Sequence, residues 1–174
     1  MFHSQRITIP IRDELGTLVG VKGRYIGNCS DAEKYLYLER CAKSRILFGL
    51  HKTMSYIKEC GEVIVVESEK SVMALWSHGI KNAVALGGHN ISKKQAELLT
   101  RCGADIVLCY DEDVARGEDG KVNKEEYLKE ANKFITGINV YAMVDFWNIL
   151  DKKQSPVDSI DKFNLLYENK KRLK

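Results

Sequence analysis

The chain has 174 residues, of which 44% are hydrophobic and 29% charged, and its formal net charge is +3 at pH 7. These values are typical of a folded protein that buries a core as one compact domain or as two small ones sharing a surface, and they exclude wholesale disorder. The charge is unevenly distributed, because residues 1–60 contain ten basic and six acidic residues. A basic front before a more acidic centre is an asymmetry that a nucleic-acid partner would exploit.

No apolar run approaches the length of a membrane span, and Met1 is followed by polar and basic residues instead of an apolar signal core. We therefore expect a cytoplasmic protein with no membrane partner. The five cysteines are odd in number, widely spaced and without a Cys-x-x-Cys pair, which indicates reduced, mostly packed thiols instead of a zinc site or a disulfide framework. They are Cys29, Cys41, Cys60, Cys102 and Cys109.

The first sixty residues predict a mixed α and β region. The stretch RITIPIRDELGTLVGVKGRYIG, which begins at Arg6, predicts two strands joined at DELG, because its isoleucines alternate with other residues. Within residues 31–50 the segments LYL and RILFGL predict short strands. A helix is expected from about His51 to Cys60, ended by Gly61.

From Val63 onward the pattern changes to short apolar strands that alternate with helices. Strands are expected at residues 63–66, 83–86, 106–109 and 139–144, and helices at residues 71–78, 92–102, 124–135 and 160–167. This order predicts an α/β fold with a parallel sheet and flanking helices. The tail ENKKRLK is expected to be frayed and solvated. We expect a basic subdomain at residues 1–60, the parallel-sheet unit at 61–150 and a helical segment at 151–174.

Polar residues that could carry chemistry follow three of these strands. Glu67 follows the first, Gly87 and Gly88 follow the second, and Asp111 and Asp113 follow the third. Ligands of open parallel sheets collect at the carboxyl ends of the strands. In an extended segment Asp111 and Asp113 would point to one side and Glu112 to the other. If the first and third strands are neighbours, three carboxylates gather, and such a site suits Mg²⁺ or Mn²⁺.

Each of these features also has a purely structural interpretation. A lone Asp-x-Asp is more often a solvated turn, an isolated Glu67 suits a helix N-terminus, and two glycines form a turn. A calcium-binding EF-hand loop starting at Asp111 is excluded, since Arg116 and Val122 occupy its glycine and bidentate-glutamate positions. The sequence has no Gly-x-x-x-x-Gly-Lys-Ser/Thr phosphate loop. The four histidines, His3, His51, His78 and His89, lack ligand spacing and are interpreted as structural or exposed.

Taken together, the motifs resemble a known family. Residues 63–113 resemble a TOPRIM domain, whose pattern is a Glu after the first strand and Asp-x-Asp after the third. RITIPIRDELGTLVGVKGRYIG, KYLYLERCAKSRILFGL and YDEDVARG resemble the RNA-polymerase (catalytic) domain of bacterial and phage DnaG-type primases. The resemblance covers about residues 6–160 and implies a TOPRIM sheet preceded by a small mixed α+β basic subdomain.

The resemblance assigns roles by position. It implies that Glu67, Asp111 and Asp113 are the catalytic and metal-binding acids, with Mg²⁺ or Mn²⁺ as cofactor. It also implies a basic surface for template strand and nucleotides, formed by Arg12, Lys22, Arg24, Lys34, Lys43 and Arg45. Any one of these cations is more often a solvated surface charge, so the cluster carries more weight than its members.

Some positions depart from the family pattern. Ser68 and Ser71 stand where the family usually has Gly and Asp, and QSPVD replaces an Asp-Pro-Asp motif after the fourth strand. Asp158 and Asp151 are then the candidate third acids. With Ser71, Gly87 and Gly88 they form a set of accessory positions, and a second metal would bind weakly or not at all. The family's zinc-binding and helicase-binding domains have no counterpart in this sequence, so we expect a core cut from a longer chain or a reduced, phage-type relative.

The function implied is synthesis of short RNA primers on single-stranded DNA by metal-dependent nucleotidyl transfer. Its partners would be the DNA template, ribonucleoside triphosphates, the RNA primer and a replicative helicase bound through regions outside this chain. Two alternatives stay open. One is a TOPRIM nuclease that uses the same acids on DNA, and the other is a non-catalytic TOPRIM module that binds single strands.

Overall fold

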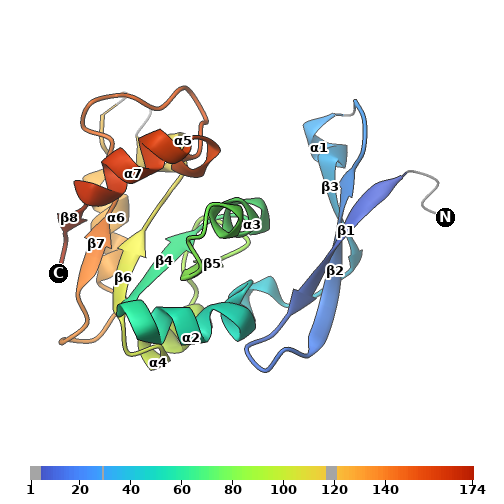
Figure 1. Ribbon diagram of the computed structural model, residues 1–174, viewed down its shortest axis with the longest axis horizontal. Helices are drawn as coiled ribbons and strands as arrows, with labels where there is room; N and C mark the ends of the chain where they lie inside the picture. The colour runs from blue at the N-terminus through green and yellow to red at the C-terminus, as the bar shows by residue number, and fades with distance from the viewer. Residues whose placement is uncertain (1–4, 29, 117–120) are drawn as a thin grey trace.

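The computed structural model describes residues 5–28, 30–116 and 121–174, which form two sheets (Figure 1). The smaller sheet is antiparallel, with the order β1 (Arg6–Arg12), β2 (Leu18–Tyr25) and β3 (Tyr35–Glu39). A short helix, α1 (Asp31–Lys34), precedes β3. The strand expected at LYL is therefore confirmed. The strand expected at RILFGL (residues 45–50) is wrong. Arg45 ends a single turn of 3-10 helix, η1 (Lys43–Arg45), Leu50 begins the next helix, and between them Phe48 makes only an isolated bridge with Ala85.

The larger sheet has five strands in the order β5 (Ala83–Ala85), β4 (Glu62–Val66), β6 (Asp105–Leu108), β7 (Val140–Ala142) and β8 (Lys171–Arg172). The first four are mutually parallel, as the β-α-β pattern predicts. The fifth, β8, is antiparallel to β7, so the tail expected to be frayed is part of the sheet. Its last residue is anchored as well, because Lys174 Nζ donates to the Phe134 carbonyl at 2.6 Å.

Helices cover both faces of this sheet. One face packs against α2 (Leu50–Cys60), α4 (Lys93–Arg101) and α6 (Lys124–Ala131), and the other against α3 (Glu69–Ser77) and α7 (Ile160–Glu168). Residues of β4 alternate between the two cores: Val63 and Val65 face the first, and Ile64 and Val66 the second. A strand buried on both faces needs apolar side chains throughout, which accounts for the run VIVV. Two short elements, α5 (Glu112–Ala115) and η2 (Pro156–Asp158), lie on the connections beyond β6 and β7.

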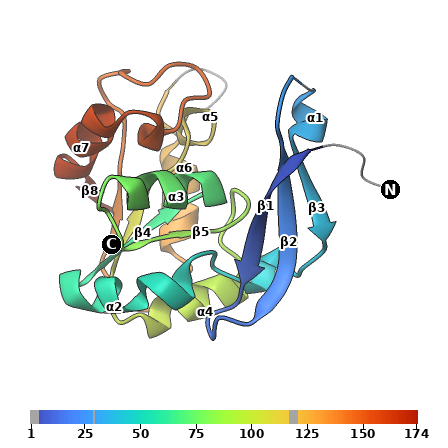
Figure 2. The ribbon, with the colours of Figure 1, turned by 45° about the vertical axis from the view of Figure 1, so that its right-hand side comes forward.

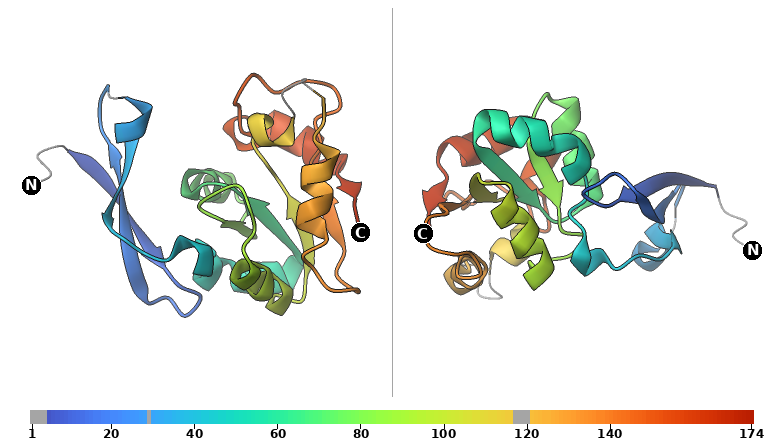
Figure 3. Two further views of the ribbon diagram at one scale, coloured as in Figure 1. Left: turned by 180° about the vertical axis from the view of Figure 1, so that it is seen from behind. Right: turned by 90° about the horizontal axis from the view of Figure 1, so that it is seen from below.

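The small sheet stands beside the β5 edge of the large one, next to α2 and α3 (Figure 2). Ile9, Ile11 and Ile46 form its own core, and Phe48 packs against both this core and the α3 face of the large sheet. The C-terminus lies on the side of the molecule away from β1 (Figure 3). In the described residues no helix has the length and apolar character needed to cross a bilayer.

Candidate functional site

The expected adjacency of the first and third strands is confirmed, because β4 pairs with β6 from Glu62 and Asp105 to Val65 and Leu108. The carboxyl ends of β4, β5 and β6 therefore meet at one edge of the sheet. Glu67, Gly87 and Asp111 leave these three strand ends. This is the edge at which parallel α/β sheets bind ligands.

Glu67 is nearly buried, with 8% of its surface exposed, and both of its carboxylate oxygens have partners. Oε1 accepts a 2.9 Å hydrogen bond from the backbone N–H of Asp111, and Oε2 lies 2.5 Å from His89 Nδ1. Burial raises the pKa of Glu67 above its usual value, an effect that the Asp111 amide and His89 oppose and the Asp111 charge reinforces. Glu67 is thus placed beside Asp111 by a direct backbone contact.

Asp111 is the residue that precedes α5, with extended backbone at φ −66° and ψ 157°. Burial raises the pKa of its carboxyl group, the Ser155 side chain lowers it by hydrogen bonding, and the charges of Asp113 and Asp158 raise it again. The acids Asp111, Asp113 and Asp158 therefore act on one another electrostatically. Lys70 is the cation that partly offsets them.

Asp113 is near Asp111 as expected, but the extended conformation expected for the segment that joins them is wrong. Asp113 lies inside the first turn of α5 and is exposed, so the two residues are not alternate members of an extended segment. The helix forms because acids at its first positions interact favourably with the free amides there. Glu112 does point elsewhere: its Oε2 accepts from the Lys153 amide at 2.8 Å, and its Oε1 lies 3.8 Å from Arg116 Nε.

The accessory acids separate into one that is near the site and one that is not. Asp158 lies in η2 and makes an ion pair with Lys70, with 2.6 Å between Oδ1 and Nζ. Asp151 has a side chain that is 85% exposed and pairs with Lys162 at 3.4 Å. Ser71 is buried, and its hydroxyl lies 3.0 Å from that of Ser68, the residue whose side chain caps α3. Ser71 thus serves the start of a helix.

Within residues 5–28, 30–116 and 121–174, no three His, Cys, Asp or Glu side chains are arranged as a ready-made metal site. Glu67, Asp111 and Asp113 are therefore near one another, but their carboxylates do not point at a common position. Glu67 Oε2 faces His89, and Asp113 lies in a helix. The chemistry of the set still fits a divalent cation. Its donors are carboxylate oxygens, and burial raises the pKa of Glu67 and Asp111, so a cation beside them would favour their charged forms.

The basic residues expected to form one surface lie in different environments. Lys22 is mostly buried, pairs with Glu69 at 2.7 Å and lies over the ring of Tyr35. Lys43 belongs to η1 and lies against the glycine turn, since a Cβ atom built on Gly88 would be 3.8 Å from its Nζ. The remaining members are at or near the surface: Arg12, Arg24, Lys34 and Arg45.

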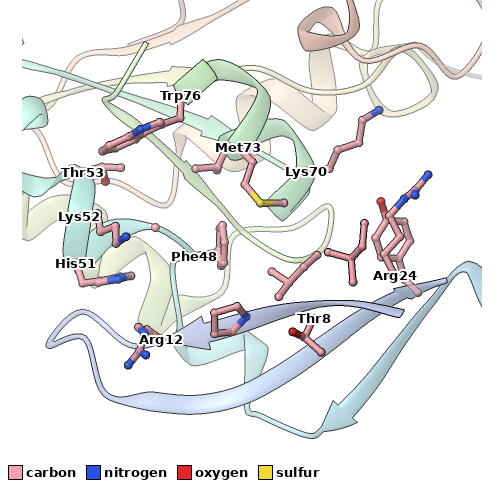
Figure 4. A pocket seen from close by; sticks show the side chains of 16 residues that line it. Thr8, Arg12, Arg24, Phe48, His51, Lys52, Thr53, Lys70, Met73 and Trp76 are labelled. Carbon is pink, nitrogen blue, oxygen red and sulfur yellow. The ribbon is translucent and has the colours of Figure 1, made fainter. Parts of the chain in front are cut away.

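The cavity between the two sheets is lined by some of these cations. It has a volume of about 510 Å³ and lies between β1 on one side and α2 and α3 on the other (Figure 4). The described residues that line it are largely apolar, and the basic ones among them are Arg12, Arg24, Lys52 and Lys70. Among the residues that the structure describes, no Asp or Glu lines it. Lys70 also pairs with Asp158, so one of the cations that line this cavity contacts an acid near Asp111.

Sequence reasoning missed three residues of this region: His89, Lys70 and Glu69. The sequence alone places His89 among the structural or exposed histidines; its side chain is indeed 65% exposed, but it contacts Glu67. The available signal was its place directly after the two glycines at a strand end.

Asp145 is another acid of the strand ends, buried and bound to Arg116, and its role is structural. Of the thiols expected to be mostly packed, Cys102 and Cys109 are buried, Cys41 is half-buried and Cys60 is exposed, and Cys29 lies outside the described residues.

Comparison with known proteins agrees with this architecture. Residues 64–145 match the model of the Toprim-like family. A DNA primase of Deinococcus radiodurans is 40% identical over 114 residues, which are 63% of this chain and 20% of that protein. A DNA primase of Escherichia coli K12 is 36% identical over 114 residues, which are 64% of this chain and 19% of that protein. The chain thus spans about a fifth of the length of the curated relatives it matches.

Solved structures extend the likeness to nearly the whole chain. A DnaG primase catalytic domain bound to single-stranded DNA superimposes with a TM-score of 0.76 and 29% identity, covering 97% of this chain and 52% of that one. The zinc-binding and RNA-polymerase domains of the Aquifex aeolicus primase give a TM-score of 0.74 and 29% identity, covering 97% and 41%. These matches confirm the Toprim fold and the resemblance to the catalytic core of DnaG-type primases that the sequence motifs indicate.

Proposed function

We propose that this chain is the catalytic part of a DNA primase, which joins ribonucleotides into a short primer on a single-stranded DNA template. The observation that carries the proposal is the hydrogen bond from the Asp111 amide to Glu67, since it places the acids of two neighbouring strand ends together. The sequence identity of 36–40% to DNA primases over 114 residues supports the same activity.

The proposed metal ligands are Glu67, Asp111 and Asp113, with Asp158 at the border of the set. A divalent cation bound by them, Mg²⁺ or Mn²⁺, would supply Lewis acidity to the attacking 3′-hydroxyl and neutralise charge on the triphosphate. The burial of Glu67 and Asp111 favours such an ion, because a cation relieves the cost of keeping two carboxylates charged in a poorly hydrated place.

The protein's own contribution is positioning and electrostatics, which dominate catalysis of phosphoryl transfer. Lys70 and Lys43 would contact phosphate groups on either side of the acids. The turn at Gly87 and Gly88 lets a ligand approach the backbone, and Gly87 has φ +70°, a conformation that side chains disfavour. The groove lined by Arg12, Arg24, Lys52 and Lys70 is the proposed path of a single strand, because its cations face phosphates and its apolar walls face bases.

The test is a primer-synthesis assay with single-stranded DNA, labelled ribonucleoside triphosphates and Mg²⁺ or Mn²⁺. Wild type is compared with Glu67→Gln, Asp111→Asn and the control Glu97→Gln, whose carboxylate lies on the exposed surface of α4. We expect oligoribonucleotides from the wild type and the control, and a loss of at least about 100-fold in the other two, the scale of losing a positioned electrostatic group.

The alternatives give different results in the same experiment. Cleavage of the DNA without nucleotide incorporation would identify a nuclease, and template binding with neither reaction would identify a binding module. Undiminished synthesis by Asp111→Asn would overturn the assignment of the acids.

A further inference from the structure

His89 is placed at the proposed metal centre by the turn after β5. The amide of Gly87 donates to the carbonyl of Glu67 at 2.9 Å, so this loop runs beside the end of β4. Two residues later His89 Nδ1 lies 2.5 Å from Glu67 Oε2. The imidazole is thus the one nitrogen donor among the described His side chains that touches a proposed metal ligand.

The loop that carries His89 is anchored on its other side as well. The amide of Ile91 donates to Glu130 Oε2 at 2.8 Å, and Lys133 Nζ donates to the Ile91 carbonyl at 2.7 Å. Ser92 then caps α4 in a reciprocal capping box with Gln95. A loop held at both ends places its side chain reproducibly, so the contact between His89 and Glu67 is built into the fold.

The separation of the two donor atoms suits a shared ion. Adjacent ligands of an octahedral cation, each bound at about 2.1 Å, are about 3 Å apart. His89 Nδ1 and Glu67 Oε2 are 2.5 Å apart, so a movement of about half an ångström opens the space that such an ion requires. The side chain of His89 is 65% exposed and free to make that movement, whereas Glu67 is fixed through its other oxygen by the Asp111 amide.

We propose that His89 is a nitrogen ligand of the divalent cation held by Glu67 and Asp111, and that it biases this site toward Mn²⁺ over Mg²⁺. The inference rests on the proposed function, of which it specifies the metal centre. Carboxylate and water ligands serve Mg²⁺ and Mn²⁺ alike, but Mg²⁺ takes oxygen donors almost exclusively, whereas a transition metal accepts imidazole. An exposed imidazole in the ligand sphere therefore discriminates between the two ions.

The test is binding of Mn²⁺ alone to the full chain, followed by electron paramagnetic resonance. Pulsed measurements detect nitrogen hyperfine coupling to bound Mn²⁺, and competition with Mg²⁺ gives the affinity of the second ion. His89→Ala removes the ligand, and His89→Gln keeps a hydrogen-bonding side chain beside Glu67 without an imidazole. His78→Ala is the matched control, because His78 is an exposed histidine at the end of α3.

We expect nitrogen coupling in wild type and His78→Ala, and none in either His89 variant. The Mn²⁺ affinity of the His89 variants should fall at least about tenfold, the smaller effect known for residues that only support a ligand, while Mg²⁺ affinity changes less than about threefold. Bound Mn²⁺ without nitrogen coupling in the wild type, or equal losses for both ions, overturns the inference.

Failure of this inference is distinguishable from failure of the proposed function. A wild type that binds no Mn²⁺ overturns the role of His89, yet primer synthesis by the same protein with Mg²⁺ would leave the primase assignment in place.

Discussion

The backbone amide of Asp111 donates a 2.9 Å hydrogen bond to the Glu67 side chain, which joins the ends of β4 and β6 through one carboxylate. The residue that is proposed to bind a cation is therefore also a structural link between neighbouring strands. Its two tasks respond differently to removal of charge, because an amide oxygen still accepts the hydrogen bond whereas it binds a divalent cation poorly.

We predict that Glu67→Gln is more stable than wild type at neutral pH when no metal is present. Burial raises the pKa of Glu67 in the folded state, so proton binding by this carboxyl group stabilises the fold. That stabilisation is complete below the pKa of the unfolded state and is lost as pH rises through the pKa of the folded state, whereas a glutamine stays neutral throughout. At pH 7 the variant should melt about 2–4 °C higher, which corresponds to about 1 kcal/mol in a chain of this size. Thermal melts at pH 4 and pH 7 test this, and the difference should vanish at pH 4.

The same pair of proteins reports on metal binding. Mn²⁺ should raise the melting temperature of the wild type in proportion to the logarithm of its concentration, because it binds the folded state. It should raise that of Glu67→Gln much less. Equal shifts in both proteins, or a variant that melts lower at pH 7 but not at pH 4, would contradict the electrostatic account.

The parallel sheet was predictable, and the site only in outline. VIVV and the apolar runs after it specify buried strands, and the glycines that end α2 and α4 follow from local backbone preferences. The adjacency of β4 and β6 depends on the order of the strands in the sheet, which the sequence alone does not determine. The pairing of β8 was missed because a short strand of charged residues carries no periodic apolar pattern.

The partners of the site residues depend on tertiary contacts that have no local signature. Glu69 and Lys22 are 47 positions apart in the chain, and their ion pair requires the small sheet to face α3. The contact between His89 and Glu67 likewise requires two strands to be neighbours. The proximity of Asp111 and Asp113 was predictable, but their conformation was not, since three acids in a row suit the first turn of a helix as well as an extended loop end.

The ion pair between Lys22 and Glu69 should be needed for stability as a pair. The side chains are 16% and 4% exposed, so removing one partner leaves a buried charge without compensation. We expect Lys22→Met to lower the free energy of unfolding by about 3 kcal/mol, the lower end of the range for buried pairs. Lys22→Met combined with Glu69→Leu should recover most of that loss, because an apolar pair costs no desolvation.

Chemical denaturation of the two single variants and the double variant completes a cycle for this pair. Lys34→Met serves as the control, since Lys34 is exposed on α1. A double variant as unstable as the sum of the single ones would show that the two side chains act independently.

Asp145 should contribute stability that is lost in acid. Burial raises the pKa of its carboxyl group, but the amides of Leu150 and Ile149 together with Arg116 outweigh burial and lower it below the usual value. A lowered folded pKa gives stability that is present above the unfolded pKa and is lost as pH falls through the folded one. Asp145→Asn should therefore lower the free energy of unfolding at pH 7 by about 1–3 kcal/mol, the usual cost of losing charged hydrogen bonds.

The pH profile separates this contribution from a simple packing defect. Urea denaturation between pH 7 and pH 3 should show the difference between Asp145→Asn and wild type shrinking as the acid is protonated. A difference that stays constant over this range would mean that the charge of Asp145 contributes nothing.

Binding of single-stranded DNA should depend on salt through the cations of the groove between the sheets. Each phosphate contact adds about 0.7 to the slope of log affinity against log salt concentration for a single strand. Arg24→Gln and Lys52→Gln should each lower the affinity for an oligonucleotide and reduce the slope by about that amount, with little dependence on base sequence. Lys93→Gln, a change of an exposed lysine of α4 outside the groove, should alter neither quantity. Fluorescence anisotropy over a series of potassium chloride concentrations gives both values. Loss of a cation that contacts a phosphate must reduce the number of counterions released on binding. If Arg24→Gln or Lys52→Gln binds the oligonucleotide as tightly as wild type and with the same salt slope, the strand therefore binds elsewhere on the molecule.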